Sequence, residues 1–388
     1  MKVVVVSPAV PHPFGETAAR GLYVLVAGLL ARGVRVACLV VTEEDAARVE
    51  DARARLATVA GPGQLELTLF APRVRPVLAR KLRSLLRPFS ETLHADGLAA
   101  ALGRHADGGY DALHLDQLWS GWVGLGRPRA LLNVYQFEVV DWEGRRLRTL
   151  AEGKALLQMR RATRRILKGS RHVRVVTPRL LERARAINAE ADCTLIPFAL
   201  DLSLYPVQPL VREPVVGLLG SMHWWPSRSA AERLITRIWP HVRRAMPQAR
   251  LLVGGWNARR YLARFAGPDI TIVENLAHPT EFFSRVAVLA YAPVRGTGVK
   301  VKVLESLAYG VPVVTTGEGM EGIDGEDGVH CWIREEDDAL AARIVDSLGD
   351  EAQRIRMREA GRALVEARHA PAPVVEQMLD AYARVSRG

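Results

Sequence analysis

The chain has few cysteines and no long hydrophobic run. Its cysteines are Cys38, Cys193 and Cys331, an odd number of widely separated positions. This spacing excludes a disulfide framework and a paired-cysteine metal site, and it indicates a reducing compartment. No apolar stretch approaches the length of a membrane span, and residues 1–7 lack the apolar core and cleavage site of a signal peptide. We therefore expect a cytoplasmic protein, either soluble or peripheral on the inner membrane face.

Lysine is also scarce, so arginine carries most of the formal net charge of +11. A net positive charge of this size is compatible with binding to nucleic acid, to an anionic membrane surface or to an anionic substrate. The chain contains no Cys/His finger, and its basic segments are not interleaved with aromatic residues. Fingers of this kind and aromatic residues among basic ones are typical of nucleic-acid binding. Because the chain lacks both, nucleic acid is not an expected partner.

Two basic segments in the N-terminal half, residues 76–89 and 159–174, predict amphipathic helices. Each segment sets leucine, isoleucine or methionine on one side and basic residues on the other. The basic residues are Arg80, Lys81, Arg83 and Arg87 in the first and Arg160, Arg161, Arg164, Arg165 and Lys168 in the second. Such helices can lie on anionic lipid, where each basic residue adds about 1 kcal/mol. The alternative is a surface helix whose apolar side packs on its own domain.

With 388 residues, the chain is long enough for two domains, each with a large apolar core. Strand-like runs alternate with helical stretches in both halves, which predicts an α/β fold with two Rossmann-like, doubly wound parallel sheets. Expected strands span 2–7, 34–41, 65–70, 112–115, 130–134, 173–177, 215–219, 250–254, 270–273, 286–291 and 311–316. The Pro-punctuated segment 206–214 reads as the linker between domains 1–206 and 207–370.

The stretch 295–323 carries the clearest functional pattern. A Gly-rich loop opens a helix at about Val299, and helix N-termini bind anions. The amides expected to hold a phosphate are those of Gly298, Val299 and Lys300. Lys302 and Glu305 share one face of the helix, so an ammonium can reach a diphosphate while a carboxylate accepts the hydroxyls of a ribose. The pattern predicts a site for a nucleotide diphosphate.

The same stretch resembles the group 1, glycogen-synthase-like glycosyltransferases of GT-B fold. The resemblance is carried by Gly-Thr-Gly at 296–298, Lys302, Leu-Glu-Ser-Leu-Ala at 304–308 and Gly-Val-Pro-Val-Val-Thr at 310–315. It implies two domains facing each other across a cleft and sugar transfer with retention of configuration. It also implies no metal ion and no cofactor, with a UDP- or GDP-linked sugar as the donor substrate. Thr297 departs from the pattern, because many members carry a second Glu there.

The resemblance also implies roles for individual residues. Lys302, Glu305 and His114 are the expected catalytic residues, although a lone histidine at a strand end is more often structural than chemical. The expected donor-binding residues are Gly15, Gly220, Ser221, His223, Arg228, Thr297, Gly298, Val299, Lys302 and Glu305. Asp116 and Glu138 are the expected acceptor contacts. Residues 371–388 are expected to form a helix that returns to the N-terminal, acceptor-binding domain.

The function expected from the resemblance is transfer of a sugar to a glycan or lipid-linked acceptor in cell-surface polysaccharide or glycolipid synthesis. Two alternatives remain open. One is a GT-B epimerase that hydrolyses its nucleotide sugar, although such a site should carry more carboxylates than Thr297 allows. The other is a catalytically silent binding protein, in keeping with the departures from the family pattern.

Overall fold

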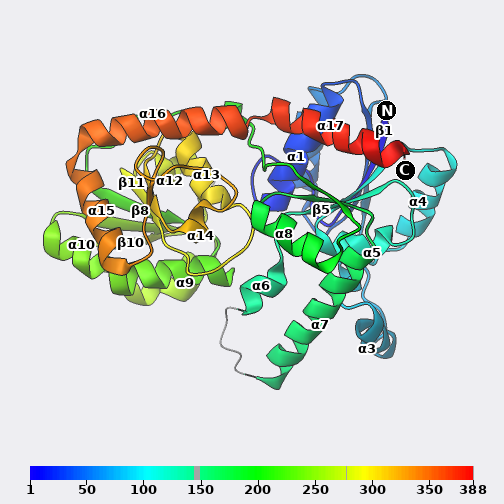
Figure 1. Cartoon of the computed structure of the whole chain (residues 1–388), viewed down its shortest axis with the longest axis horizontal. Helices are drawn as coiled ribbons and strands as arrows, with labels where there is room; N and C mark the ends of the chain where they lie inside the picture. The colour runs from blue at the N-terminus through cyan, green and yellow to red at the C-terminus, as the bar shows by residue number, and fades with distance from the viewer. Residues whose placement is uncertain (144–148, 277, 388) are drawn as a thin grey trace. The chain divides into compact units, whose positions relative to one another are not determined.

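A computed structural model describes residues 1–143, 149–276 and 278–387, which divide into two compact units (Figure 1). Unit 1 comprises Met1–Leu200 together with the segment from Pro371, and unit 2 comprises Asp201–Ala370. Each unit contains one parallel sheet flanked by helices. The predicted fold class, two Rossmann-like doubly wound α/β domains, is confirmed.

The sheet of unit 1 has seven strands in the order β3-β2-β1-β4-β5-β6-β7, and every neighbouring pair is parallel. The strands are β1 Lys2–Ser7, β2 Arg35–Val41, β3 Leu65–Phe70, β4 Ala112–Asp116, β5 Ala130–Val134, β6 His172–Val175 and β7 Asp192–Leu195. The order reverses between β1 and β4. In an open parallel sheet this is the switch point at which loops diverge and ligands bind.

The helices of unit 1 cover both faces of its sheet and include the last helix of the chain. They are α1 Thr17–Leu30, α2 Ala46–Ala57, α3 Val77–Leu86, α4 Leu98–Asp107, α5 Gly121–Gly124, α6 Glu138–Glu143, α7 Leu150–Lys168, α8 Pro178–Ile187 and α17 Pro371–Arg387. A Cβ at Gly28 of α1 would lie 2.4 Å from Cγ2 of Val375, so glycine permits the close approach of α1 and α17. Val375, Met378 and Tyr382 thereby enter the core of unit 1.

The sheet of unit 2 has six parallel strands in the order β10-β9-β8-β11-β12-β13, with its switch point between β8 and β11. The strands are β8 Val215–Leu219, β9 Arg250–Gly254, β10 Ile270–Val273, β11 Val288–Tyr291, β12 Val313–Thr315 and β13 Trp332–Ile333. The helices are α9 Trp225–Arg233, α10 Trp239–Ala245, α11 Ala258–Leu262, α12 Thr280–Phe283, α13 Val301–Ala308, α14 Gly317–Met320, α15 Asp337–Gly349 and α16 Glu351–Arg368. A π-helical segment, Leu234–Ile238, joins α9 to α10.

Part of the segment predicted as a linker is bound to unit 2. The backbone N–H of Gln208 donates to the carbonyl of Tyr309 at 2.9 Å, and Arg362 donates to the carbonyl of Tyr205 at 2.7 Å. These bonds use backbone groups that a free linker would leave to water. The units accordingly divide earlier, between Leu200 and Asp201.

Two composition-based expectations can be compared with the fold. All three cysteines are buried and unpaired. Across residues 1–143, 149–276 and 278–387, none of the helices combines the length and apolar character needed to cross a membrane.

Candidate functional site in unit 2

Two loops of unit 2 diverge at the switch point between β8 and β11. One follows β8 and leads into α9, and the other follows β11 and leads into α13. Because the strands are parallel, both loops lie at the carboxyl edge of the sheet, where open α/β sheets bind their ligands. The Gly-rich loop at 295–300 and the loop that carries Gly220, Ser221 and His223 are therefore neighbours in unit 2.

Lys302 lies in the first turn of α13 and points toward α9. Its Nζ donates to Oγ of Ser227 at 3.1 Å and lies 4.4 Å from the centre of the Tyr291 ring. The aromatic face and the hydroxyl hold the ammonium at the strand edge. A lysine placed in this way supplies a positive point charge for a phosphate.

Gly220 makes room for this arrangement. A Cβ at this position would lie 2.9 Å from Cε of Lys302 and 3.2 Å from Oγ of Ser227. Gly255 has a φ of +132°, and a Cβ there would lie 1.9 Å from the carbonyl oxygen of Gly220. Gly255 is therefore required both by contact with backbone and by its conformation, whereas a side chain at Gly220 would displace the end of Lys302.

The loop before α13 is held by two carboxylates that follow β12. Nζ of Lys300 donates to the carbonyl of Gly298 at 2.6 Å and lies 3.4 Å from Oε2 of Glu321. The N–H of Gly296 donates to Oε1 of Glu318 at 3.0 Å. Gly298 has a φ of +77°, which favours glycine. The side chain of Lys300 thus fixes the loop, whereas that of Lys302 points to α9.

The helix begins two residues later than predicted. Its first residue is Val301, with Lys300 as the N-terminal flanking residue, whereas the sequence placed the start at about Val299. Thr297 and Val299 are buried in the loop. Glu305 lies one turn after Lys302 and is 3% exposed. The structure therefore brings Lys302, Gly220 and Ser227 into contact and places Glu305 on the same short helix.

His223 and Arg228 each lie against an aromatic ring. The His223 ring meets Trp256 edge to face at 5.8 Å, and the guanidinium of Arg228 lies 4.5 Å from the centre of the Tyr261 ring. Ser221 accepts a backbone bond from Trp224 beside them. Trp256, which was not among the predicted site residues, follows β9 and is 60% exposed. In the sequence, the one local sign of this residue is its position directly after the Gly-Gly pair at the end of a buried strand.

In unit 1, His114 and Asp116 occupy a buried network at the carboxyl end of β4. Nδ1 of His114 lies 2.9 Å from the hydroxyl of Tyr382, and neither His114 nor Asp116 has exposed surface. The Asp116 carboxylate accepts from Ser7 at 3.0 Å and from Asn133 at 2.9 Å. These contacts tie β1, β4, β5 and α17 together. For His114 they favour the structural role that was left open for a histidine at a strand end.

Glu138, the other predicted acceptor contact, begins α6. Its Oε1 accepts from the indole N–H of Trp119 at 3.1 Å. Burial raises the pKa of the Glu138 carboxyl, and the bond from Trp119 acts in the opposite direction. The side chain remains partly exposed, so it is better placed than Asp116 to meet a ligand.

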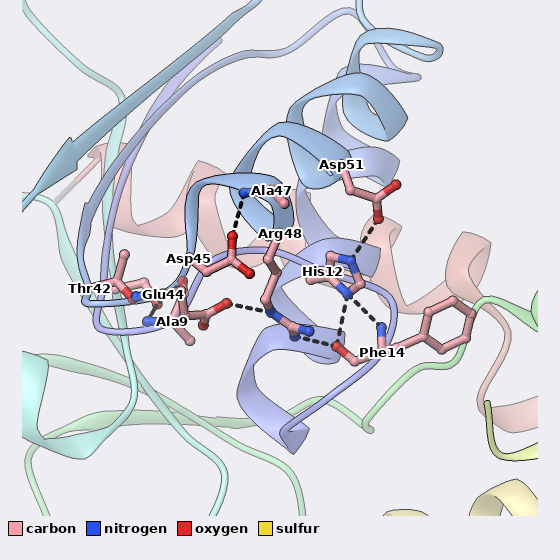
Figure 2. A network of polar contacts seen from close by, with 10 residues as sticks. Ala9, His12, Phe14, Thr42, Glu44, Asp45, Ala47, Arg48 and Asp51 are labelled. Carbon is pink, nitrogen blue, oxygen red and sulfur yellow. Dashed lines mark hydrogen bonds and ion pairs between the residues drawn. The ribbon is translucent and has the colours of Figure 1, made fainter. Parts of the chain in front are cut away.

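The loop after β1, which contains Gly15, is fixed by side chains of α2 (Figure 2). Nε2 of His12 lies 2.8 Å from the Asp51 carboxylate, and its Nδ1 accepts from the N–H of Phe14 at 3.1 Å. Arg48 donates to the carbonyl of Phe14 at 2.6 Å. Gly15 has a φ of +110°, and a Cβ there would lie 2.4 Å from Nη2 of Arg48. The conformation of this loop therefore depends on glycine.

Asp51 lies between two basic side chains, His12 and Arg55. The guanidinium of Arg55 hydrogen-bonds Asp51 and lowers the pKa of that carboxyl, burial opposes this effect, and His12 adds to the lowering. Asp51 thus remains a carboxylate and orients His12 toward the loop. Gly15 is held beside α2 by this chain of contacts.

Comparison with known proteins is most informative for unit 2. Residues 213–350 match the family model described as glycosyl transferases group 1. The likeness to group 1 glycosyltransferases therefore lies in unit 2. The matched residues include both loops at the switch point and the whole of α13. No curated protein matches the chain.

Solved structures with the GT-B fold of glycosyltransferases resemble the whole chain. HepE of Anabaena in complex with UDP-glucose is 14% identical, with a TM-score of 0.69 over 99% of this chain and 100% of that chain. Sucrose-phosphate synthase of Thermosynechococcus elongatus is 18% identical, with a TM-score of 0.73 over 99% of each chain. WaaG, a glycosyltransferase involved in lipopolysaccharide biosynthesis, is 13% identical, with a TM-score of 0.63 over 97% of this chain and 98% of that chain. At these identities the likeness shows the fold.

A metal site has no visible candidate in the part of the chain that the structure describes. Among those residues, no three His, Cys, Asp or Glu side chains gather as metal ligands would. The cationic side chains near the switch point of unit 2 are Lys302 and Arg228, with the imidazole of His223 beside them.

Proposed function

We propose that the protein transfers a sugar from a UDP- or GDP-linked donor, bound by unit 2, to an acceptor bound by unit 1. The observation that carries this proposal is the position of Lys302. Its ammonium lies beside Ser227 and Gly220 at the β8/β11 switch point, with Glu305 on the next turn of α13. The likeness to HepE, which was solved with UDP-glucose, supports a nucleotide sugar as the donor.

In the proposed reaction, side chains stabilise charge and bind the donor, and none of them forms a covalent bond to the sugar. Lys302 stabilises the negative charge that develops on the departing diphosphate, with Arg228 and His223 as further cationic groups. Electrostatic stabilisation of this kind acts where charge appears in the transition state. Glu305 accepts the ribose hydroxyls. An oxygen of the leaving diphosphate takes the acceptor proton on the same face of the sugar, which retains the anomeric configuration without a metal ion.

The proposed acceptor is a glycan or a lipid-linked saccharide used in cell-surface polysaccharide or glycolipid synthesis. WaaG, which has a similar fold, is involved in lipopolysaccharide biosynthesis and supports this class. Glu138 is the candidate acceptor contact in unit 1, because this residue is partly exposed whereas Asp116 is not. The reaction would take place in the cytoplasm, at the inner face of the membrane.

Thermal unfolding with nucleotide sugars tests the donor site. A ligand at a hundredfold its Kd stabilises the protein by about 2.7 kcal/mol, and UDP-glucose and GDP-mannose with and without chelator are suitable probes. Lys302→Met and Glu305→Gln should each weaken binding by about tenfold or more, the cost of one charged contact. Lys154→Met and Glu359→Gln are matched controls on exposed helix surfaces and should bind as the wild type does. Unchanged donor binding in both site variants would contradict the proposal.

Thr297 favours one alternative, a GT-B protein that binds a nucleotide sugar without turnover. A hydroxyl there cannot accept two hydrogen bonds as strongly as a carboxylate can. Incubation with radiolabelled donor and membrane extract separates the two functions. Label in glycan or lipid supports transfer, intact donor supports the binding protein, and free labelled sugar indicates hydrolysis.

A further inference from the structure

Helix α3 of unit 1 has its apolar side turned away from the protein. None of its residues is buried, and its leucines are among the most exposed in the chain. The exposed fractions are 81% for Leu78, 63% for Leu82, 65% for Leu85 and 62% for Leu86. A surface helix of a soluble domain normally shows the opposite arrangement, with its apolar stripe against the core. The sequence periodicity alone could not distinguish the two orientations.

The polar side of α3 faces unit 1 instead. Nε of Arg83 donates to Oγ of Ser90 at 3.3 Å, and both Arg83 and Ser84 are half-buried. From α7, Gln158 donates to the carbonyl of Ser84 at 3.5 Å and Arg165 donates to the carbonyl of Leu86 at 3.0 Å. These polar contacts hold α3 beside α7 (Figure 1). They leave the leucines on the outer surface.

Basic residues border the exposed leucines. Arg80, Lys81 and Arg87 of this segment are all exposed. Arg161 lies on the same face of α7 as Gln158 and Arg165, since these positions are three and seven residues apart. An apolar ridge bordered by arginine and lysine is complementary to a bilayer with anionic headgroups.

The second basic segment behaves differently. The apolar side of α7 is buried in unit 1, where Met159, Ala162, Ile166 and Leu167 join the core. Within the second basic segment α7 therefore offers no apolar side to lipid, and its exposed leucines, Leu150 and Leu157, precede that segment. Its arginines can add only surface charge. Of the two predicted amphipathic helices, α3 alone retains the membrane-binding arrangement.

We propose that α3 and the adjoining arginines of α7 form a docking surface for anionic lipid bilayers. Leu78, Leu82, Leu85 and Leu86 enter the interface between headgroups and acyl chains, while Arg80, Lys81 and Arg87 meet the phosphates. A second copy of the chain fits less well, because a symmetric contact through α3 would bring these like charges together. The proposal does not depend on the reaction proposed above, because vesicle binding is measured without substrate.

Vesicle flotation of the full chain tests the proposal. The wild type should float with phosphatidylglycerol vesicles and not with phosphatidylcholine vesicles, and 0.5 M salt should weaken its binding. Leu78→Gln/Leu82→Gln/Leu85→Gln should weaken binding at least about tenfold, since glutamine keeps helix propensity while removing apolar surface. Arg80→Gln/Lys81→Gln/Arg87→Gln should weaken it roughly a hundredfold. The control is Val329→Gln/Ile355→Gln, two exposed apolar residues of unit 2.

Three outcomes would overturn the proposal. One is a wild-type protein that fails to float with anionic vesicles. Another is a triple-leucine variant that floats as the wild type does and has the same circular dichroism spectrum. The last is a wild-type protein that sediments as a dimer while the triple-leucine variant sediments as a monomer. That result would assign the surface to a second copy of the chain.

Discussion

The amino group of Lys302 donates to the hydroxyl of Ser227, a residue 75 positions earlier in the chain, at 3.1 Å. Gly220 lies beside both side chains, where a Cβ would meet them at 2.9 and 3.2 Å. The ammonium is thus positioned by residues that follow β8, although it belongs to the helix that follows β11. A change on either side of the switch point should affect the same ligand.

Gly220→Ala should displace the Lys302 side chain. Because the end of a lysine can move at little cost, we expect unit 2 to lose only about 1 kcal/mol of stability. Affinity for a nucleotide sugar should fall about tenfold, as measured by isothermal titration calorimetry, since the ammonium no longer meets the diphosphate. Gly103→Ala in α4 is the control, because a Cβ there meets nothing within 4 Å and alanine favours a helix. Equal affinities in the wild type and Gly220→Ala would refute the arrangement.

Tyr382→Phe should destabilise unit 1 and leave nucleotide binding unchanged. The substitution removes the hydroxyl that lies 2.9 Å from Nδ1 of the fully buried His114, at a cost of about 1 to 3 kcal/mol. Urea unfolding measures the loss. Tyr110→Phe, which removes a weaker bond of 3.3 Å to the carbonyl of Pro128, should cost less. An unchanged stability combined with a shifted pH profile of sugar transfer would instead assign His114 a chemical role.

The buried thiols should resist modification until the protein unfolds. Burial raises the pKa of Cys38 to about 12, with Asp116 and Glu66 adding to the effect. Burial and Asp327 likewise raise the pKa of Cys331 to about 12. Ellman's reagent at pH 8 should therefore leave both thiols unmodified in the folded protein and titrate them in urea. Labelling of both at the rate of a free thiol would contradict the burial.

The same thiols predict the direction of a pH effect on stability. Their pKa values are higher in the folded state than the ordinary value of 9.0. Their contribution is therefore fully present below about pH 9 and is lost as the pH rises toward 12. Urea midpoints should fall over this range, and the fall should be shallower in Cys331→Ala than in the wild type. A parallel decline in both proteins would show that other groups dominate.

The sequence predicted eleven of the thirteen strands found in the described residues. The bounds of β1, β3 and β8 agree residue for residue with the prediction, because each lies between turn residues and is either a continuous apolar run, as in β1 and β8, or an alternating one, as in β3. The edge strands β7 and β13 were not predicted. Asp192–Leu195 mixes exposed and buried positions, and Trp332–Ile333 is only two residues long, so neither has a hydrophobic period to detect.

The candidate site was predictable only along one helix. The spacing of Lys302 and Glu305 places both on α13, and the chemistry of an ammonium and a carboxylate on one helix face gave their proposed roles. The partners of Lys302 come from other elements, Ser227 on α9 and Tyr291 at the end of β11, and no local pattern joins them. The outward orientation of the α3 leucines is likewise a tertiary property. The leucine spacing predicted the helix, whereas Gln158 and Arg165 of α7 determine which side faces out.

The return of α17 to unit 1 has a consequence for how the chain folds during synthesis. Val375, Met378 and Tyr382 belong to the core built on α1, yet the ribosome adds them after the whole of unit 2. Residues 201–370 can therefore complete their own core first, while the earlier-made unit 1 still exposes the apolar groove that α17 fills. Nascent chains stalled before Pro371 should hold a protease-resistant second half and a chaperone-dependent first half.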